Sequence, residues 1–394
     1  MVSLNNAWNL SLSRTLLLMV PFDLLASLGM DVYLPAVPEM TSVFTTSPGA
    51  VQLTLSLYML MLGCGQLVFG PLSDRLGRRP VLLAGILLFI VSSVALVQVS
   101  TIEAFIVWRL CQGAGGAASL VATFATVRDV YGQRREAATV YALLGGMLAF
   151  VPALGPVIGA LLIDWAGWHA VFWGLAVIAI LAGLQAVIAW PETRTVVSGI
   201  DLKTAFLQVI RSREFWLYTV AFAVAMGSFF VYFSTAPRIL IGKLGYSPLA
   251  FSLLFSTVAL VMIVMSRFAG RIVSRYGIPG TLRLGMVAIG IGALLMLVAH
   301  TFSFSGTASL LIPMWVVAVG ISCTCAVSAN GALAEFQSIA GTAVALYYCI
   351  EALLVCIVGT VVVTVLPGDT LWPLIVFCGG GAVVVLAGTV WVRP

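Results

Sequence analysis

The feature that most constrains this chain is a succession of apolar stretches of about 20 residues with very few charges inside them. Of its 394 residues, 61% are hydrophobic and only 8% are charged. A soluble globular domain is about half apolar and about a quarter charged. A helix that spans a lipid bilayer needs about 20 predominantly apolar residues. The sequence therefore predicts an all-α membrane protein.

Twelve stretches meet this requirement, and we expect each to form a transmembrane helix. Together they use most of the chain, which leaves no room for a soluble domain. The first stretch lacks a cleavage site of small residues, so we expect it to be retained. The expected spans are 15–37, 51–71, 81–98, 104–126, 138–162, 169–190, 214–236, 249–269, 282–300, 307–329, 341–366 and 372–392.

The basic residues are distributed unevenly among the expected loops. Most of the 19 lysines and arginines fall on the side of the membrane that holds the N-terminus, whereas Arg238 and Lys243 fall on the other side. Cytoplasmic loops are enriched in lysine and arginine, so we expect both termini to be cytoplasmic. The net charge of +5 is then a sign of topology, and we expect no nucleic-acid partner.

The chain contains an internal repeat. Gly70, Arg75, Gly77 and Gly85 recur 200 residues later as Gly270, Arg275, Gly277 and Gly285. A duplicated set of helices in the same orientation is a parallel membrane repeat, which is typical of transporters. We therefore expect an N-terminal six-helix bundle over 1–190, a central cytoplasmic loop over 191–213 and a C-terminal six-helix bundle over 214–394.

The loop "GPLSDRLGRRP" (70–80) concentrates charge between two apolar walls. A topology anchor explains its arginines, but it does not explain Asp74, which the second copy replaces with Ser274. We expect Asp74 to pair with Arg78 or Arg128 and the loop to act as a cytoplasmic latch. The expected conformational gate comprises Gly70, Asp74, Arg75, Gly77, Arg78 and Arg128, together with Gly155 and Pro156 in the fifth span.

Four charged residues lie clearly inside expected spans, away from the span ends, namely Asp23, Asp31, Arg109 and Glu351. Such residues are costly in lipid and are functional candidates by default. Asp23 and Asp31 are about 12 Å apart along one helix and about 80° apart around it, so their staggered depths suit a proton that is released to alternate faces. The alternative is that one of these acids only neutralises Arg109. We expect all four residues to take part in proton coupling.

Arg109 forms a helical stripe with Gln112, Gly113 and Gly116, along which a neighbouring helix can approach closely. Its charge is expected to keep an adjacent carboxylate ionised until substrate or movement separates the two; snorkelling to the outer interface is the alternative. Glu351, without a visible partner in the sequence, is expected to bind a proton or a cation.

The fifth span carries Pro152, Gly155, Pro156 and Gly159, which predict a kinked helix with a small-residue face. Helix packing and a gating role are equally compatible with this pattern. Aromatic and adaptable side chains in the cavity helices suit a flat, moderately apolar ligand, although most aromatic residues of a membrane protein face lipid. The expected substrate-binding residues are Asp23, Asp31, Tyr33, Tyr58, Met147, Phe150, Tyr232 and Tyr347, with Trp315 and Tyr348 as further aromatic candidates.

The polar residues exclude several other classes of protein. The seven cysteines all fall inside expected spans and form no Cys-x-x-Cys pair, so we expect no metal and no disulfide. The two histidines lie at outer span ends, away from any nucleophile or metal-type spacing, which argues against a membrane enzyme. A nucleotide-binding loop is absent from the sequence, so we expect no cofactor and no direct use of ATP. A structural or receptor-like role does not account for the staggered charges.

Several ordered motifs resemble those of the major facilitator superfamily. The resemblance covers essentially the whole chain and is closest to bacterial twelve-helix drug:proton antiporters that export chloramphenicol and florfenicol. In the fifth-helix motif, Val151 and Ala160 stand where the full pattern has glycines. The motifs are "FDLLASLGMDVYLPAVP" (22–38), "TLSLYMLMLGCGQ" (54–66), "GPLSDRLGRRPVLL" (70–83), "RLCQGAGGAA" (109–118), "PALGPVIGALL" (152–162) and "FSTAPRILIG" (233–242).

The resemblance implies the fold of twelve helices in two halves. It also implies a proton-driven exporter of small amphiphilic drugs, in particular of the phenicol class, in a bacterial inner membrane. The expected partners are the drug, protons and membrane lipid, and the expected state is a monomer. A proton-coupled metabolite or sugar symporter of the same fold is the alternative. A sugar-phosphate exchanger fits less well, because only Arg109 is an intramembrane arginine.

Overall fold

The protein is described by a computed structural model for residues 8, 10–131, 140, 143–144, 146–147, 150–194, 202–304, 306–336 and 339–391. These residues form helices and connecting turns, with no strand among them. The chain divides into two compact units, Met1–Gly199 and Ile200–Pro394. The predicted all-α membrane architecture is confirmed.

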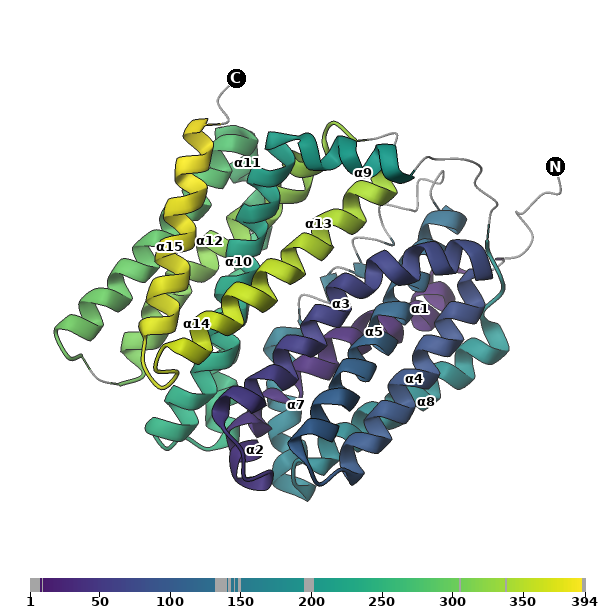
Figure 1. Ribbon diagram of the computed structural model, residues 1–394, viewed down its shortest axis with the longest axis horizontal. Helices are drawn as coiled ribbons and strands as arrows, with labels where there is room; N and C mark the ends of the chain where they lie inside the picture. The colour runs from purple at the N-terminus through teal and green to yellow at the C-terminus, as the bar shows by residue number, and fades with distance from the viewer. Residues whose placement is uncertain are drawn as a thin grey trace. The chain divides into compact units, whose positions relative to one another are not determined.

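The first unit is built from long apolar helices and two short helical segments at the end of the first of them (Figure 1). Within the span predicted over 138–162, the described helix begins at Val151, with Pro152 in its first turn. Proline is tolerated there because the first N–H groups of a helix have no partner within the helix. In chain order the elements are α1 (Leu12–Asp31), the 3₁₀-helix η2 (Leu34–Ala36), α2 (Val37–Val43), α3 (Pro48–Leu76), α4 (Arg78–Gln98), α5 (Ile102–Tyr131), α7 (Val151–Ala166) and α8 (His169–Ala189).

The second unit begins with a short helix inside the segment predicted as the central loop (Figure 1). Two of its long spans contain π-helical turns, η3 and η5. In chain order the elements are α9 (Leu202–Arg211), α10 (Arg213–Pro237), η3 (Arg238–Lys243), α11 (Pro248–Thr301), α12 (Ala308–Leu333), α13 (Ala340–Leu354), η5 (Val355–Gly359), α14 (Thr360–Val365) and α15 (Trp372–Trp391).

The described helices account for the twelve predicted spans. Ten helical segments are long and apolar enough to cross a membrane, and Val151–Ala166 is a shorter apolar helix. The longest segment, α11, has 54 residues and is broken at Gly277, so it supplies both the eighth and the ninth span. The spans that the sequence predicts at 249–269 and 282–300 are the two arms of α11.

The two units repeat the same internal packing. In the first, α5 packs against α1, α3 and α4, and α8 packs against α1 and α4. In the second, α12 packs against α10 and against the two arms of α11, which correspond to α3 and α4. In the same unit, α15 packs against α10 and α11. This correspondence is the one that the sequence repeat predicts.

Matching residues also begin corresponding helices. Ser47 caps α3 by accepting a hydrogen bond from the backbone of Ala50, and Ser247 caps α11 by accepting one from Ala250. A proline follows each serine at the first helical position, where its fixed φ angle suits a helix start. The first arm of α11 and α3 therefore begin in the same way, 200 residues apart.

Two pairs of glycines allow close helix crossings at equivalent places. A Cβ atom on Gly85 would lie 2.9 Å from the carbonyl oxygen of Gly115, and one on Gly285 would lie 2.9 Å from that of Gly320. The backbone of α4 therefore lies close to that of α5, and the second arm of α11 lies close to α12 in the same way. Small residues at a helix interface allow such close approach.

The turn glycines of the two repeats share an unusual backbone conformation. Gly77 has φ 111°, and Gly277 has φ 68°. Residues with a side chain rarely adopt these angles. The sharp turn between the second and third spans, and its copy between the eighth and ninth, therefore both depend on glycine.

We expect Gly277→Ala to destabilise the protein by about 1–3 kcal/mol, because a non-glycine residue held in a sparsely populated backbone region carries a cost of that order. The matched control is Gly270→Ala in the same helix, where an added Cβ meets no atom within 4 Å. Thermal unfolding of detergent-purified protein measures the difference. Equal melting temperatures for the two variants would contradict this account of the turn.

Candidate functional site

The centre of the first unit is the side chain of Arg109 on α5, which is completely buried. Its Nε atom donates to the carbonyl of Thr54 on α3 at 3.2 Å, and Nη1 donates to the carbonyl of Gly29 on α1 at 2.8 Å. Nη1 also donates to Oε1 of Gln112 at 2.6 Å, and Gln112 in turn donates to Ser93 of α4. One guanidinium therefore links three helices directly and reaches a fourth through Gln112.

Aromatic rings surround the same guanidinium. The Cζ atom of Arg109 lies 4.2 Å from the ring centre of Tyr58 and 5.0 Å from that of Tyr33, which are cation–π distances. The phenol of Tyr58 donates to the carbonyl of Ala26, and that of Tyr33 lies 3.3 Å from the hydroxyl of Thr54. Both tyrosines are fully buried, so here they pack around Arg109, and their predicted contact with substrate stays a prediction.

The expected pairing of Arg109 with a carboxylate is not seen among the described residues, whose ion pairs all involve Arg78 or Arg128. Carbonyl dipoles, Gln112 and aromatic faces stabilise the charge instead. The Nη2 atom of Arg109 has no hydrogen-bond partner in this part of the chain. Because Arg109 is wholly buried, snorkelling to the interface does not describe its position.

Asp23 lies in the middle of α1 with its carboxyl group enclosed. The residue is only 1% exposed, and neither carboxyl oxygen has a hydrogen-bond partner among the described residues. Buried polar groups in proteins are nearly always hydrogen-bonded, so an exception asks for an explanation. The two open acceptors make Asp23 the best candidate in this unit for binding a proton or a hydrogen-bond donor.

Asp31, the last residue of α1, lies where α1 meets α7. A Cβ atom on Gly155 would come 2.6 Å from the Cβ of Asp31, and one on Gly159 would come still closer to the carbonyl oxygen of Val32. Pro156 is buried between these two glycines. The small-residue face predicted for the fifth span therefore packs against the end of α1. Its expected gating role stays a prediction.

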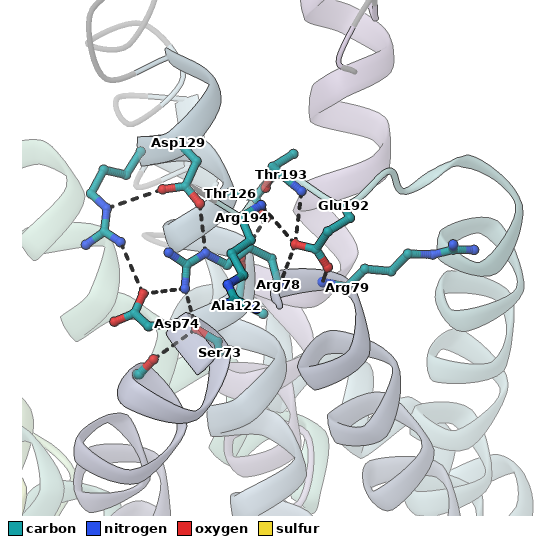
Figure 2. Close-up of polar contacts among 12 residues, drawn as sticks. Ser73, Asp74, Arg78, Arg79, Ala122, Thr126, Asp129, Glu192, Thr193 and Arg194 are labelled. Carbon is teal, nitrogen blue, oxygen red and sulfur yellow. Dashed lines mark hydrogen bonds and ion pairs between the residues drawn. The ribbon is translucent and has the colours of Figure 1, made fainter. Parts of the chain in front are cut away.

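The charged loop forms an ion-pair network at one end of the first unit (Figure 2). Arg78, whose side chain is 1% exposed, pairs with Asp74 at 2.5 Å and with Asp129 of α5 at 2.7 Å. It also donates to Ser73, and Arg128 lies 3.8 Å from Asp74. Asp74 was predicted to pair with Arg78 or Arg128, and it pairs with both.

A second carboxylate, that of Glu192, joins the end of α8 to the start of α4 (Figure 2). Its oxygens accept from the backbone N–H groups of Arg78 at 2.8 Å and Arg79 at 3.1 Å, and also from those of Thr193 and Arg194. The first N–H groups of a helix have no partner within the helix, so Glu192 caps α4. A Cβ atom on Gly77 would lie 2.5 Å from this carboxylate, which is a second reason for glycine in the turn.

Sequence reasoning missed Asp129 and Glu192. Each was detectable as an acid at the end of a span on the side predicted to hold the basic loop, because an arginine cluster there needs counter-charges. Of the other predicted gate residues, Arg75 lies exposed in the last turn of α3, and the carbonyl of Gly70 accepts from Ser73. Neither takes part in the ion pairs.

The remaining predicted residues are divided between the two units. Met147 and Phe150 of the first unit are exposed. In the second unit, Tyr232 is buried and stacks on Phe255 at 4.8 Å, and Tyr347 is buried and stacks on Phe222 at 4.9 Å. The further aromatic candidate Trp315 donates to Thr257, whereas Glu351 and Tyr348 lie beside Tyr347 on α13.

The described residues contain no group of three or more histidine, cysteine, aspartate or glutamate side chains that suits a metal ion. All seven cysteines are free.

Comparison with known proteins decides the family. The sequence model of the Major Facilitator Superfamily matches residues 23–360. The chain belongs to this superfamily. A chloramphenicol resistance protein of Pseudomonas aeruginosa is 47% identical over 387 residues, which cover 98% of this chain and 92% of the relative. A bicyclomycin resistance protein homolog of Haemophilus influenzae is 26% identical and covers 92% of each chain.

Solved structures of the superfamily share the fold. A D-xylose–proton symporter matches with a TM-score of 0.73 at 18% identity, covering 96% of this chain and 97% of the symporter. A peptide transporter crystallised with sulfate matches with a TM-score of 0.77 at 14% identity, covering 96% and 93%. At such low identity the likeness concerns the fold alone.

The two aspartates that pair with Arg78 differ in burial, which leads to a prediction. The side chain of Asp129 is 5% exposed and that of Asp74 is 57% exposed. Removing one partner of a buried ion pair costs about 3–5 kcal/mol, whereas an exposed pair contributes about 0–1 kcal/mol. We expect Asp129→Ala to lower the thermal stability of the purified protein much more than Asp74→Ala. Equal losses in the two variants would refute the ranking.

Proposed function

We propose that the protein exports small amphiphilic drugs, and specifically phenicol antibiotics such as chloramphenicol and florfenicol, in exchange for protons by alternating access. The observation that carries this proposal is the 47% identity over nearly the whole chain to a protein named for chloramphenicol resistance. Relatives named for resistance to bicyclomycin and to several drugs support efflux as the shared activity. A sugar symporter of the same fold is supported only by a likeness of fold.

Asp23 is proposed as the group at which drug and proton meet. A phenicol is uncharged and carries hydroxyl and amide donors, so an ionised carboxylate can accept hydrogen bonds from it. A proton bound to the same carboxyl group would remove its charge and weaken it as an acceptor, because a protonated carboxyl keeps only part of its acceptor capacity. Drug binding and proton release are then reciprocally linked, as any coupling free energy between two ligands must be. The unpartnered oxygens of Asp23 support this role.

Arg109 is proposed to hold the geometry of this region. Its bonds to Gly29 and Thr54 tie α5 to α1, the helix that carries Asp23 and Asp31, and to α3. Its open Nη2 donor is available to a ligand or to a carboxylate in another state of the transport cycle. Glu351 is proposed as the ionisable group of the second unit.

The proposed setting is the bacterial cytoplasmic membrane, with both termini cytoplasmic and the protein acting as a monomer. The proton gradient supplies the energy, without a cofactor and without catalysis of a chemical reaction. The ion-pair network around Arg78 is proposed as the latch that biases two conformations, which need to differ by only a few kcal/mol.

The function is tested by chloramphenicol accumulation in cells that express the protein, and Asp23→Asn tests the mechanism. We expect wild-type cells to accumulate less drug than cells without the protein, and an uncoupler to abolish the difference. Asp23→Asn should abolish export, because asparagine cannot bind and release a proton, yet leave drug binding measurable, because its amide oxygen still accepts a hydrogen bond.

The matched control is Asp164→Asn, which removes an exposed carboxylate from α7 of the same unit and should export normally. Export by Asp23→Asn at the wild-type rate would place the proton site elsewhere. Wild-type accumulation equal to that of cells without the protein would overturn the function itself.

The hydrogen bonds of Arg109 predict that another positively charged side chain cannot replace it in function. Lysine keeps the charge but loses the planar fork that donates from Nε and Nη1 in different directions. We expect Arg109→Lys to retain little export and Arg109→Ala to retain none, with both proteins present in the membrane. Wild-type export by the lysine variant would show that Arg109 acts only as a point charge.

A further inference from the structure

An arginine and a tryptophan from two neighbouring spans meet at one end of the second unit. Arg213 is the first residue of α10 and Trp391 is the last residue of α15, and these two helices pack against each other. The guanidinium carbon of Arg213 lies 4.6 Å from the ring centre of Trp391, which is a cation–π distance. Both helices belong to segments long and apolar enough to cross a membrane, so the pair lies at the level of the membrane surface.

A second tryptophan connects this pair to α9, which lies at the same end of the unit (Figure 1). Trp216 follows Arg213 by three positions, so the two side chains share one face of α10. The Nε1 atom of Trp216 donates to the carbonyl of Ile210, in the last turn of α9, at 2.8 Å. Arg211 follows Ile210 and is exposed. Together, Arg211, Arg213, Trp216 and Trp391 form the arginine–tryptophan patch.

Beside the patch, α9 carries apolar side chains that its own unit does not cover. Ala205 and Val209 are buried, and α9 packs against α10 and α13. Phe206 and Leu207 are each 43% exposed. Leu207 precedes Arg211 by four positions, so an exposed apolar side chain and an exposed charge share one face. Helices with this combination lie at the boundary between lipid headgroups and acyl chains.

The two arginines of the patch are available to an outside anion. Neither forms an ion pair with an acid of the described residues. Two nearby acids have other contacts. Glu335 accepts from the hydroxyl of Ser212 at 3.3 Å, and Glu214 interacts electrostatically with Tyr218, four positions further along α10. The patch therefore combines free guanidinium donors with exposed indole rings.

We propose that the arginine–tryptophan patch binds the headgroup phosphate of one anionic phospholipid, with phosphatidylglycerol as the partner that the chemistry fits. The planar fork of a guanidinium matches the oxygens of a phosphate. Tryptophan rings favour the depth of the headgroups, and the exposed Phe206 and Leu207 offer an apolar surface to an acyl chain. Zwitterionic lipids carry a cation next to the phosphate, which the two arginines repel. This partner is additional to the drug and the proton.

A general attraction between basic side chains and an anionic membrane surface would not need these contacts. Arg271 provides the comparison, because it is an exposed arginine of the same unit. Its aromatic neighbour, Phe268, belongs to the same helix and lies 5.8 Å away, whereas Arg213 lies against a ring of a second helix. General attraction predicts equal effects from losing either arginine, and a defined site predicts an effect at Arg213 alone.

The experiment titrates the purified full-length protein in detergent with phosphatidylglycerol or phosphatidylcholine of the same acyl chains. Native mass spectrometry gives the dissociation constant of the first bound lipid. We expect the wild type to prefer phosphatidylglycerol at least about tenfold, because two arginines contribute. One basic residue near an anionic surface contributes about 1 kcal/mol and about 1.4 kcal/mol is tenfold, so Arg213→Gln should weaken this binding about fivefold. Trp391→Leu should weaken it while keeping both arginines, and Arg271→Gln should bind like the wild type.

Equal binding of the two lipids by the wild type, or equal losses in Arg213→Gln and Arg271→Gln, overturns the proposal. Complete displacement of phosphatidylglycerol by inorganic phosphate would also overturn it, because the site would then be one for free phosphate. If Arg213→Gln does not fold, Trp391→Leu decides, and wild-type binding by that variant counts against the site. The readout involves no drug transport, so its failure is distinguishable from a failure of the proposed export.

Discussion

The first unit depends on the burial of one guanidinium group. Arg109 is enclosed in apolar surroundings, where an unpaired charge is costly, and its hydrogen bonds go to backbone carbonyls of α1 and α3. Carbonyls do not titrate, so this stabilisation persists whatever the protonation state of the neighbouring acids. The rings of Tyr33 and Tyr58 pack against it, and its bond to Gly29 joins α1 to α5. Asp23 and Asp31 are therefore presented from a helix that is held in place independently of their own charge.

The architecture was predictable from the sequence because each helix that crosses a lipid bilayer needs about 20 predominantly apolar residues. Apolar length alone located the spans to within a few residues, and the recurrence of Gly77 as Gly277 predicted the repeated turn. The pairing of Asp74 with Arg78 was also predictable, because an acidic and a basic residue four positions apart often lie within contact distance.

Other contacts were not predictable, because they join residues that are distant in the chain. Glu192 follows Gly77 by more than a hundred residues, and only the packing of α8 against α4 brings its carboxylate to the start of α4. The partners of Arg109 were mistaken for the same reason. The sequence shows which side chains carry charge, but every residue has a backbone carbonyl. Which carbonyls accept from Arg109, here those of Gly29 and Thr54, depends on how the helices are rotated against one another.

The two repeated turns have the same backbone shape but different bonding. Around Gly77, Glu192 and the ion pairs of Arg78 hold the chain, whereas around Gly277 the described residues form no ion pair, and Ser274 bonds only to Gly270 within its own helix. Local opening is easier where fewer contacts must break. Amide hydrogens that follow Gly277 should therefore exchange with solvent faster than those that follow Gly77. The two repeated turns would then differ in mobility although both depend on a glycine with positive φ.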